Sequence, residues 1–97
     1  MSLEQLFQDE IKESQRWINT AEGVYKRDLI KRIELINWVL ENMKNSDICA
    51  IIESSMNEII DKINKKHSIT ERDPLDSELR ILDWILYQVC SNELKKI

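Results

Sequence analysis

The sequence predicts an all-α protein, and more specifically an antiparallel four-helix bundle built from a duplicated helical hairpin. Two observations indicate helices: apolar residues recur at helical spacing along most of the chain, and its 97 residues include one Gly and one Pro. A protein of strands and turns needs turn residues throughout, and a disordered chain does not contain 42% apolar residues. At this length we expect a single helical domain, 1–97, with hairpin one at about 2–44 and hairpin two at about 46–94.

The third observation is an internal repeat at a spacing of 46 residues. The segment 32–43 (RIELINWVLENM) matches the segment 78–89 (ELRILDWILYQV), and Trp38 falls on Trp84. Both copies contain a seam of apolar residues spaced alternately by four and three, which is typical of a helix that faces a bundle. The two seams are Leu29, Ile33, Ile36, Leu40 and Met43, and Leu75, Leu79, Leu82, Leu86 and Val89. At an offset of 45 the first predicted helix resembles the third, so we interpret the whole hairpin as duplicated.

The first helix is predicted from about residue 2 to residue 18. Ser2 followed by Gln5 forms a capping-box pattern at its start, and apolar residues then recur at helical spacing. The main alternative is one continuous helix over residues 2–44, because apolar residues almost bridge the two periods. Such a helix would give an elongated chain that needs a second copy to bury its flanks.

The second helix is predicted to be capped by Asn19, with Glu22 three places further on. Gly23 weakens the first turn, so we expect the helix to settle near Val24. We expect it to end near Lys44, where three polar residues supply a short connection and a new cap.

The second half of the chain predicts two more helices. A wide apolar arc over residues 48–63 indicates the third helix. Residues 65–72 have no apolar period and are predicted to form the exposed connector. Asp73 followed by Pro74 places a cap residue before a proline at the first helical position, so we expect the last helix to run from this proline to about residue 93.

The two cysteines, Cys49 and Cys90, lie 41 residues apart without a Cys-x-x-Cys motif or nearby histidines. This pattern matches neither a zinc site nor a thioredoxin-like redox motif. We therefore expect reduced cysteines that behave as small residues flanking a helix core, with a disulfide as the alternative.

An apolar strip on the side away from each seam is the candidate interface. Leu35 and Trp38 lie on this side of the second helix, and Ile81 and Trp84 hold the equivalent places in the last helix, with Tyr87 one turn beyond. Two such strips make a patch of a few hundred Å², on the order of the size that drives association. The alternative is that these helices are broadly buried and the tryptophans belong to an ordinary core.

A small group of basic residues, Arg27, Lys31 and Arg32, lies close to Trp38 along the second helix. A cation beside an aromatic ring is the pairing that single-stranded nucleic acid uses, so these residues are candidate nucleic-acid contacts. Acidic residues border the same strip, and a charged run on a helix is more often a solvated face. A net charge of −4 also argues against a general nucleic-acid coat.

Residues for catalysis are mostly missing from the sequence. His67 is the one histidine and lies in a polar segment without a partner that would make it a base or a ligand. The chain has no glycine-rich phosphate loop, no His-Glu-x-x-His motif and no Glu-x-x-His pair. We therefore expect no enzyme activity, no catalytic residue, no metal, no cofactor and no small-molecule substrate.

The function predicted from these features is that of a non-enzymatic protein–protein interaction module, an adaptor or inhibitor subunit. We expect it to form a homodimer or to dock onto a larger protein partner. The alternative is a small accessory subunit of a nucleic-acid-bound assembly that uses the local basic patch. The absence of a long uncharged apolar window and the acidic N-terminal sequence predict a soluble, cytoplasmic protein without membrane contact.

Overall fold

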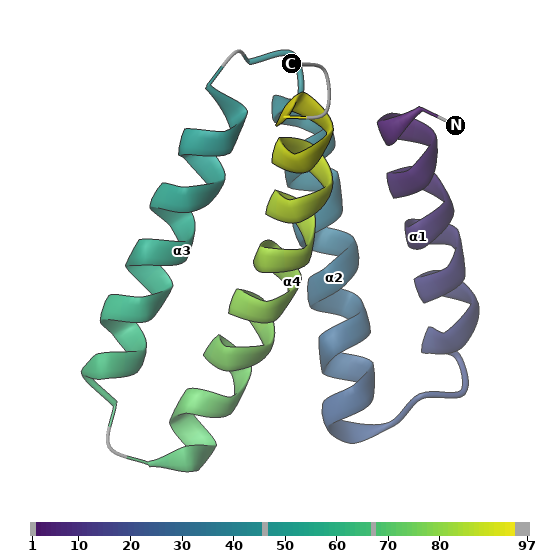
Figure 1. Cartoon of the computed structure of the whole chain (residues 1–97). Helices are drawn as coiled ribbons and strands as arrows, with labels where there is room; N and C mark the ends of the chain where they lie inside the picture. Colours follow the sequence, from purple (N-terminus) through teal and green to yellow (C-terminus); the bar gives the residue numbers. More distant parts are fainter. Residues whose placement is uncertain (1, 46, 67, 95–97) are drawn as a thin grey trace. The chain divides into compact units, whose positions relative to one another are not determined.

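A computed structural model describes residues 2–45, 47–66 and 68–94 of the chain. These residues form four helices, which are α1 (Leu3–Ile18), α2 (Gly23–Asn42), α3 (Ile48–Asn64) and α4 (Ile69–Leu94) (Figure 1). The part of the chain that the structure describes is 86% helical and contains no strand. The all-α prediction is therefore confirmed.

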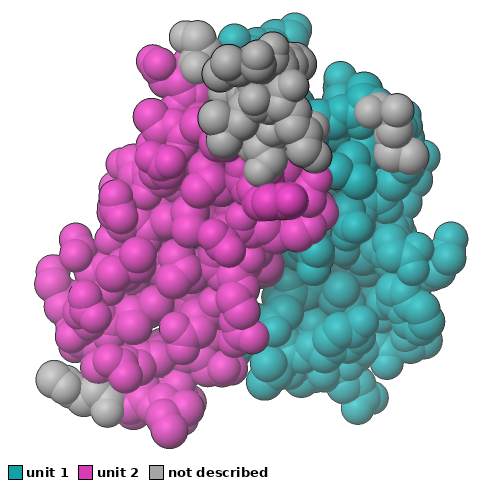
Figure 2. Space-filling model, in the orientation of Figure 1, with its two compact units in different colours: residues 1–44 teal, residues 45–97 magenta. Residues whose placement is uncertain are grey.

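The chain divides into two compact units, residues 1–44 and residues 45–97 (Figure 2). In the first unit α1 contacts α2, and in the second unit α3 contacts α4. Each unit is thus a pair of helices joined by a short connection (Figure 1). The closure of both pairs into one antiparallel bundle stays a prediction.

Apolar side chains of both helices are buried in each unit. All ten residues of the two predicted seams are buried or half-buried. The buried apolar residues of the first unit are Phe7, Ile11, Ala21, Leu29, Ile36 and Val39. Those of the second unit are Ile48, Ile52, Ile59, Ile81, Leu82, Ile85 and Val89. Removing this apolar surface from water is the main favourable contribution to the stability of the helices.

Helix α1 starts at the predicted cap. The Ser2 hydroxyl accepts a hydrogen bond of 3.1 Å from the Gln5 backbone N–H. The Gln5 side-chain amide donates to the Asp9 carboxylate at 2.9 Å, one turn further along the helix. The first half of the predicted capping box is thus present, while the Gln5 amide takes an i, i+4 partner.

The predicted cap of α2 at Asn19 is wrong. Asn19 has helical backbone angles, φ −65° and ψ −25°, and forms the C-cap of α1, whereas an N-cap residue needs extended angles. Glu22 has such angles and is the N-cap of α2, without a hydrogen bond from its side chain to the helix. The alternative of one continuous helix over residues 2–44 is wrong for the same reason, because Glu22 is extended and interrupts it.

Gly23 makes the entry into α2 possible. Its φ of 62° is the one positive φ among the described residues, and it lies in the left-handed region that favours glycine. A Cβ atom added at this position would meet no atom within 4 Å, so the need for glycine comes from the backbone and not from crowding.

Helix α3 begins and ends as predicted, whereas the predicted start of α4 is wrong. Helix α4 begins at Ile69, so Pro74 lies inside the helix and Asp73 is not its cap. The Ser68 hydroxyl accepts from the Glu71 backbone N–H at 3.2 Å, which makes Ser68 the capping residue. The connector is correspondingly shorter than the predicted 65–72, and His67 lies outside the described residues.

The first turn of α4 persists although a proline follows it. Pro74 has no N–H to donate to the carbonyl of Thr70, and such a loss inside a helix costs about 3 kcal/mol. Two contacts stabilise the turn before it: the cap at Ser68, and a hydrogen bond of 3.3 Å from Arg72 Nε to the carbonyl of Ile63 at the end of α3. The sequence Ser-Ile-Thr-Glu over residues 68–71 is itself a capping-box pattern, and it is the signal that marks this boundary.

The replacement Gly23→Ala is expected to lower the free energy of unfolding by about 1 to 2 kcal/mol, because an L-residue is strained at this φ. Gly23→Asn is the control. Because asparagine tolerates the left-handed region, this replacement should lower the free energy of unfolding less. Urea unfolding of the three proteins measures the difference. An alanine variant as stable as the wild type would mean that α2 is entered through another backbone conformation.

The replacement Ser68→Ala is expected to destabilise the protein by about 1 kcal/mol, because α4 loses its cap. The same change at Ser54, an exposed residue within α3, is the matched control and should cause no loss because alanine is the better helix former. Thermal melts in one buffer compare the two variants. Equal melting temperatures for Ser68→Ala and the wild type would contradict a helix start at Ile69.

Candidate functional site

The predicted interface residues differ in how far the structure exposes them. In the second unit Tyr87 is 64% exposed, Trp84 is half-buried and Ile81 is 8% exposed. In the first unit Leu35 and Trp38 are both half-buried. The aromatic side chain that α4 presents most openly is therefore Tyr87, with Trp84 one helical turn before it.

A second group of exposed apolar residues surrounds the connection between α1 and α2. Trp17 is 47% exposed in the last turn of α1, and Val24 and Tyr25 are exposed in the first turn of α2. The Trp17 indole N–H donates to the Glu13 carboxylate at 2.9 Å, and Glu13 also pairs with Arg16 at 3.5 Å. This local network holds the indole along the helix surface.

In the sequence Trp17 is one of the apolar residues that recur at helical spacing in α1, which predicts a buried side chain, whereas the structure leaves it 47% exposed. The signal was present in the spacing. Phe7, Ile11, Ser14 and Ile18 follow one face of the helix, and all four are buried or half-buried. Trp17 precedes Ile18 by one residue and is therefore rotated by about 100° away from that face.

Each predicted nucleic-acid contact has a carboxylate partner within the first unit. The Arg27 guanidinium donates twice to Asp28 Oδ1, at 3.0 and 3.2 Å. Lys31 Nζ lies 3.1 Å from Glu34 Oε2. Surface pairs of this kind contribute about 0–1 kcal/mol, so a competing anion can displace them.

Arg32 differs from the other two cations because its carboxylate comes from another helix. Its Nε lies 3.5 Å from Glu10 Oε2, and both side chains are 33% exposed. The pair connects α2 to α1. Arg32 is therefore involved in the packing of the first unit rather than free to contact a ligand.

A shallow groove of about 450 Å³ follows one face of α2. Its residues are spaced by three and four along the helix and combine three cations, one carboxylate and one exposed isoleucine. They are Gly23, Lys26, Arg27, Ile30, Lys31 and Glu34. The groove therefore includes two of the three predicted nucleic-acid contacts and leaves out Arg32.

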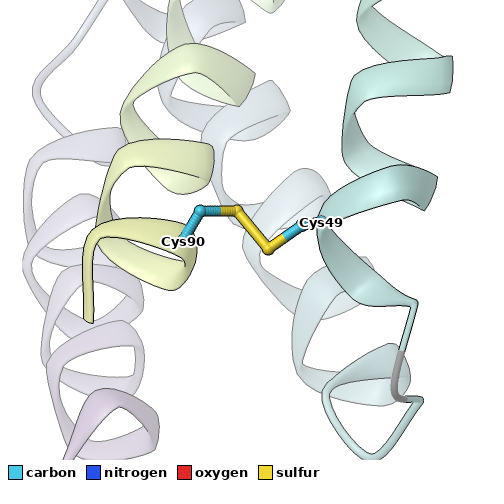
Figure 3. The surroundings of a disulfide bond; sticks show 2 residues. All are labelled: Cys49 and Cys90. Carbon is cyan, nitrogen blue, oxygen red and sulfur yellow. A yellow bond between two sulfur atoms is a disulfide. The ribbon is translucent and has the colours of Figure 1, made fainter. Parts of the chain in front are cut away.

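The two cysteines form a disulfide, so the prediction of reduced cysteines is wrong. Figure 3 shows the Cys49–Cys90 bond between α3 and α4, with a Cα–Cα distance of 6.2 Å. Cys49 is the second residue of α3, and Cys90 lies near the end of α4. A separation of 41 residues in the sequence gives no sign of this pairing, which results from the contact between the two helices.

In the part of the chain that the structure describes, no group of three or more His, Cys, Asp or Glu residues is arranged to hold a metal ion. None of the described helices is long and apolar enough to cross a membrane.

Comparison with protein-family models, with curated proteins and with solved structures finds no match to this chain.

Proposed function

We propose that the protein is a non-enzymatic protein–protein interaction module, an adaptor or inhibitor subunit, that associates with a second copy of itself or with a larger protein partner. The observation that carries the proposal is Tyr87, a large aromatic residue of α4 that is 64% exposed and follows the half-buried Trp84 by one turn. Aromatic residues are enriched at the centres of protein interfaces and account for much of their affinity.

The internal repeat extends this proposal to the first unit. At an offset of 46 residues, Leu35 and Trp38 correspond to Ile81 and Trp84. Because Ile81 of the second unit is buried, the residues that this unit offers for contact are Trp84 and Tyr87, and those of the first unit are Leu35 and Trp38. A duplicated hairpin that closes into an antiparallel four-helix bundle belongs to the same proposal. So does a cytoplasmic location, which would expose the Cys49–Cys90 disulfide to reducing thiols.

The test begins with Tyr87→Ser. An exposed tyrosine contributes little to folding, so we expect the variant to stay folded and to weaken self-association by about tenfold or more. Tyr25→Ser is the matched control, because Tyr25 is 57% exposed and lies outside the predicted interface. Light scattering over a concentration series measures association, and circular dichroism checks the fold.

The double replacement of Trp38 and Trp84 by serine separates an interface from a core. Loss of an interface tryptophan leaves a folded monomer, whereas loss of a core tryptophan costs about 3–5 kcal/mol of folding stability. A wild type that is monomeric at high micromolar concentration, together with a double variant that unfolds, would show that the tryptophans are core and that the homodimer is wrong.

A second candidate function is that of an accessory subunit in a nucleic-acid-bound assembly. The groove along α2 favours it, because Lys26, Arg27 and Lys31 surround an exposed apolar residue there. The carboxylate partners of Arg27 and Lys31 weigh against it, since they reduce the positive charge available to phosphates.

Salt dependence distinguishes the two candidates. If α2 binds single-stranded nucleic acid, its affinity for a fluorescent oligonucleotide should fall steeply between low and moderate salt, because bound phosphates release counterions. Lys26→Gln with Lys31→Gln should then weaken binding, whereas Lys62→Gln on α3 should not. Association through an apolar strip should change little over the same salt range.

A further inference from the structure

The Cys49–Cys90 disulfide is the one covalent cross-link of the described residues, and its position within the second unit is specific. It joins the first turn of α3 to the last turns of α4 (Figure 3). The short connection between the two helices, residues 65–68, lies far from the bond along both helices. The disulfide therefore holds together the ends of α3 and α4 that the connection leaves unjoined.

Both cysteines are half-buried rather than fully enclosed. Thiol–disulfide exchange requires a thiolate to reach one of the two sulfur atoms, and we expect partly exposed cysteines to permit this in the folded state. The first two helices contain no cysteine, so any thiol chemistry of this chain acts on the second unit alone.

The two sulfur atoms lie at opposite ends of their helices. Cys49 lies in the first turn of α3, where the positive end of the helix dipole favours a thiolate. Asp47, the N-cap residue of the same helix, carries an exposed carboxylate that opposes this effect in part. Cys90 lies about one turn before the last residue of α4, where the helix dipole offers no such stabilisation. Cys49 is therefore the better leaving group of the pair.

We propose that Cys49–Cys90 is a reversible thiol–disulfide site through which a dithiol reductant controls the stability of the second unit. A thiolate of the dithiol attacks Cys90 Sγ, and Cys49 leaves as a thiolate. The second thiol of the dithiol then attacks the mixed disulfide and releases Cys90. The protein disulfide is reduced by two electrons and gains two protons, and the dithiol is oxidised to its own disulfide.

Reduction should loosen the end of α4 more than any other described part of the chain. In the folded protein the bond ties the last turns of α4 to the first turn of α3, and reduction removes this tie. Reduction also frees the unfolded chain from a loop closed between two residues 41 positions apart, which lowers the stability of the second unit as a whole. Tyr87 lies one turn before Cys90, so the released segment includes the exposed aromatic residue of α4. The inference does not require the proposed association, because its measurements concern the thiols and the second unit by themselves.

The test uses the purified full-length chain without denaturant. Mass spectrometry after alkylation should show no free thiol in the oxidised protein and two free thiols after treatment with dithiothreitol, and removal of the reductant in air should restore the bond. The melting temperature should fall on reduction by on the order of 10 °C. A bond that resists dithiothreitol until denaturant is added, or cysteines that never pair, would overturn the proposal.

Hydrogen exchange locates the effect. Amides of residues 84–90 should exchange at least tenfold faster in the reduced protein, while amides of α1 serve as the internal control and should not change. Equal acceleration in α1 would show general unfolding and contradict a local effect.

The double variant Cys49→Ser, Cys90→Ser should have the melting temperature of the reduced wild type, and adding the reductant should not change it. If this variant does not fold, the melting temperature of the reduced wild type itself serves for the comparison.

The single variants test the direction of attack. With Cys90→Ser, the remaining Cys49 should react with iodoacetamide at neutral pH several-fold faster than Cys90 does in the Cys49→Ser variant, because its thiolate is the more stable. A faster reaction of Cys90 would overturn the assignment of Cys49 as the leaving group.

Discussion

Apolar contact between two helices is the interaction on which the rest of this structure depends. An isolated helix of the length of α1 or α3, 16 and 17 residues, is marginal in water because nucleation is costly. Pairing removes the apolar face of each helix from water. In the first unit this buries Phe7 and Ile11 of α1, and in the second it buries Ile52 of α3 and Leu82 of α4. The short connections, the surface charges and the disulfide all act on helices that this contact has already stabilised.

The chain separates its helices although it contains few glycines and prolines. The one glycine, Gly23, provides the left-handed conformation at the entry into α2. The one proline, Pro74, does not start or stop a helix, because the cap at Ser68 and the contact of Arg72 with α3 stabilise the turn before it. Side-chain capping bonds therefore mark the starts of α1 and α4, whereas α2 starts without one, at the positive φ of Gly23.

Charged and aromatic residues are distributed differently on the two helical pairs. Arg32 is occupied by packing against α1 through Glu10, while Arg27 and Lys31 pair with neighbours on α2 and line a groove. Tyr87 is open on α4 and lies one turn from the disulfide at Cys90. The second unit thus combines an exposed aromatic residue with a disulfide, whereas the first unit combines a basic groove with exposed residues around its connection.

Much of the fold follows from the sequence, because helix formation and capping are local. The 3.6-residue apolar period predicted four helices, and the pair Ser2 and Gln5 located the start of α1. The start of α4 was also encoded locally, in Ser68 and Glu71, although the Asp73-Pro74 pair pointed to a later residue. In the candidate site, the type and spacing of the residues predicted a role for Tyr87 and for the basic residues of α2, and that role stays a prediction. The exposure of these residues and their carboxylate partners depend on how each helix is rotated about its axis against its neighbour. Where several neighbouring residues of a helix are apolar, the sequence does not specify that rotation.

The disulfide was decided by tertiary structure alone. Cys49 and Cys90 are 41 residues apart, and only the contact of α3 with α4 brings their Cα atoms to 6.2 Å.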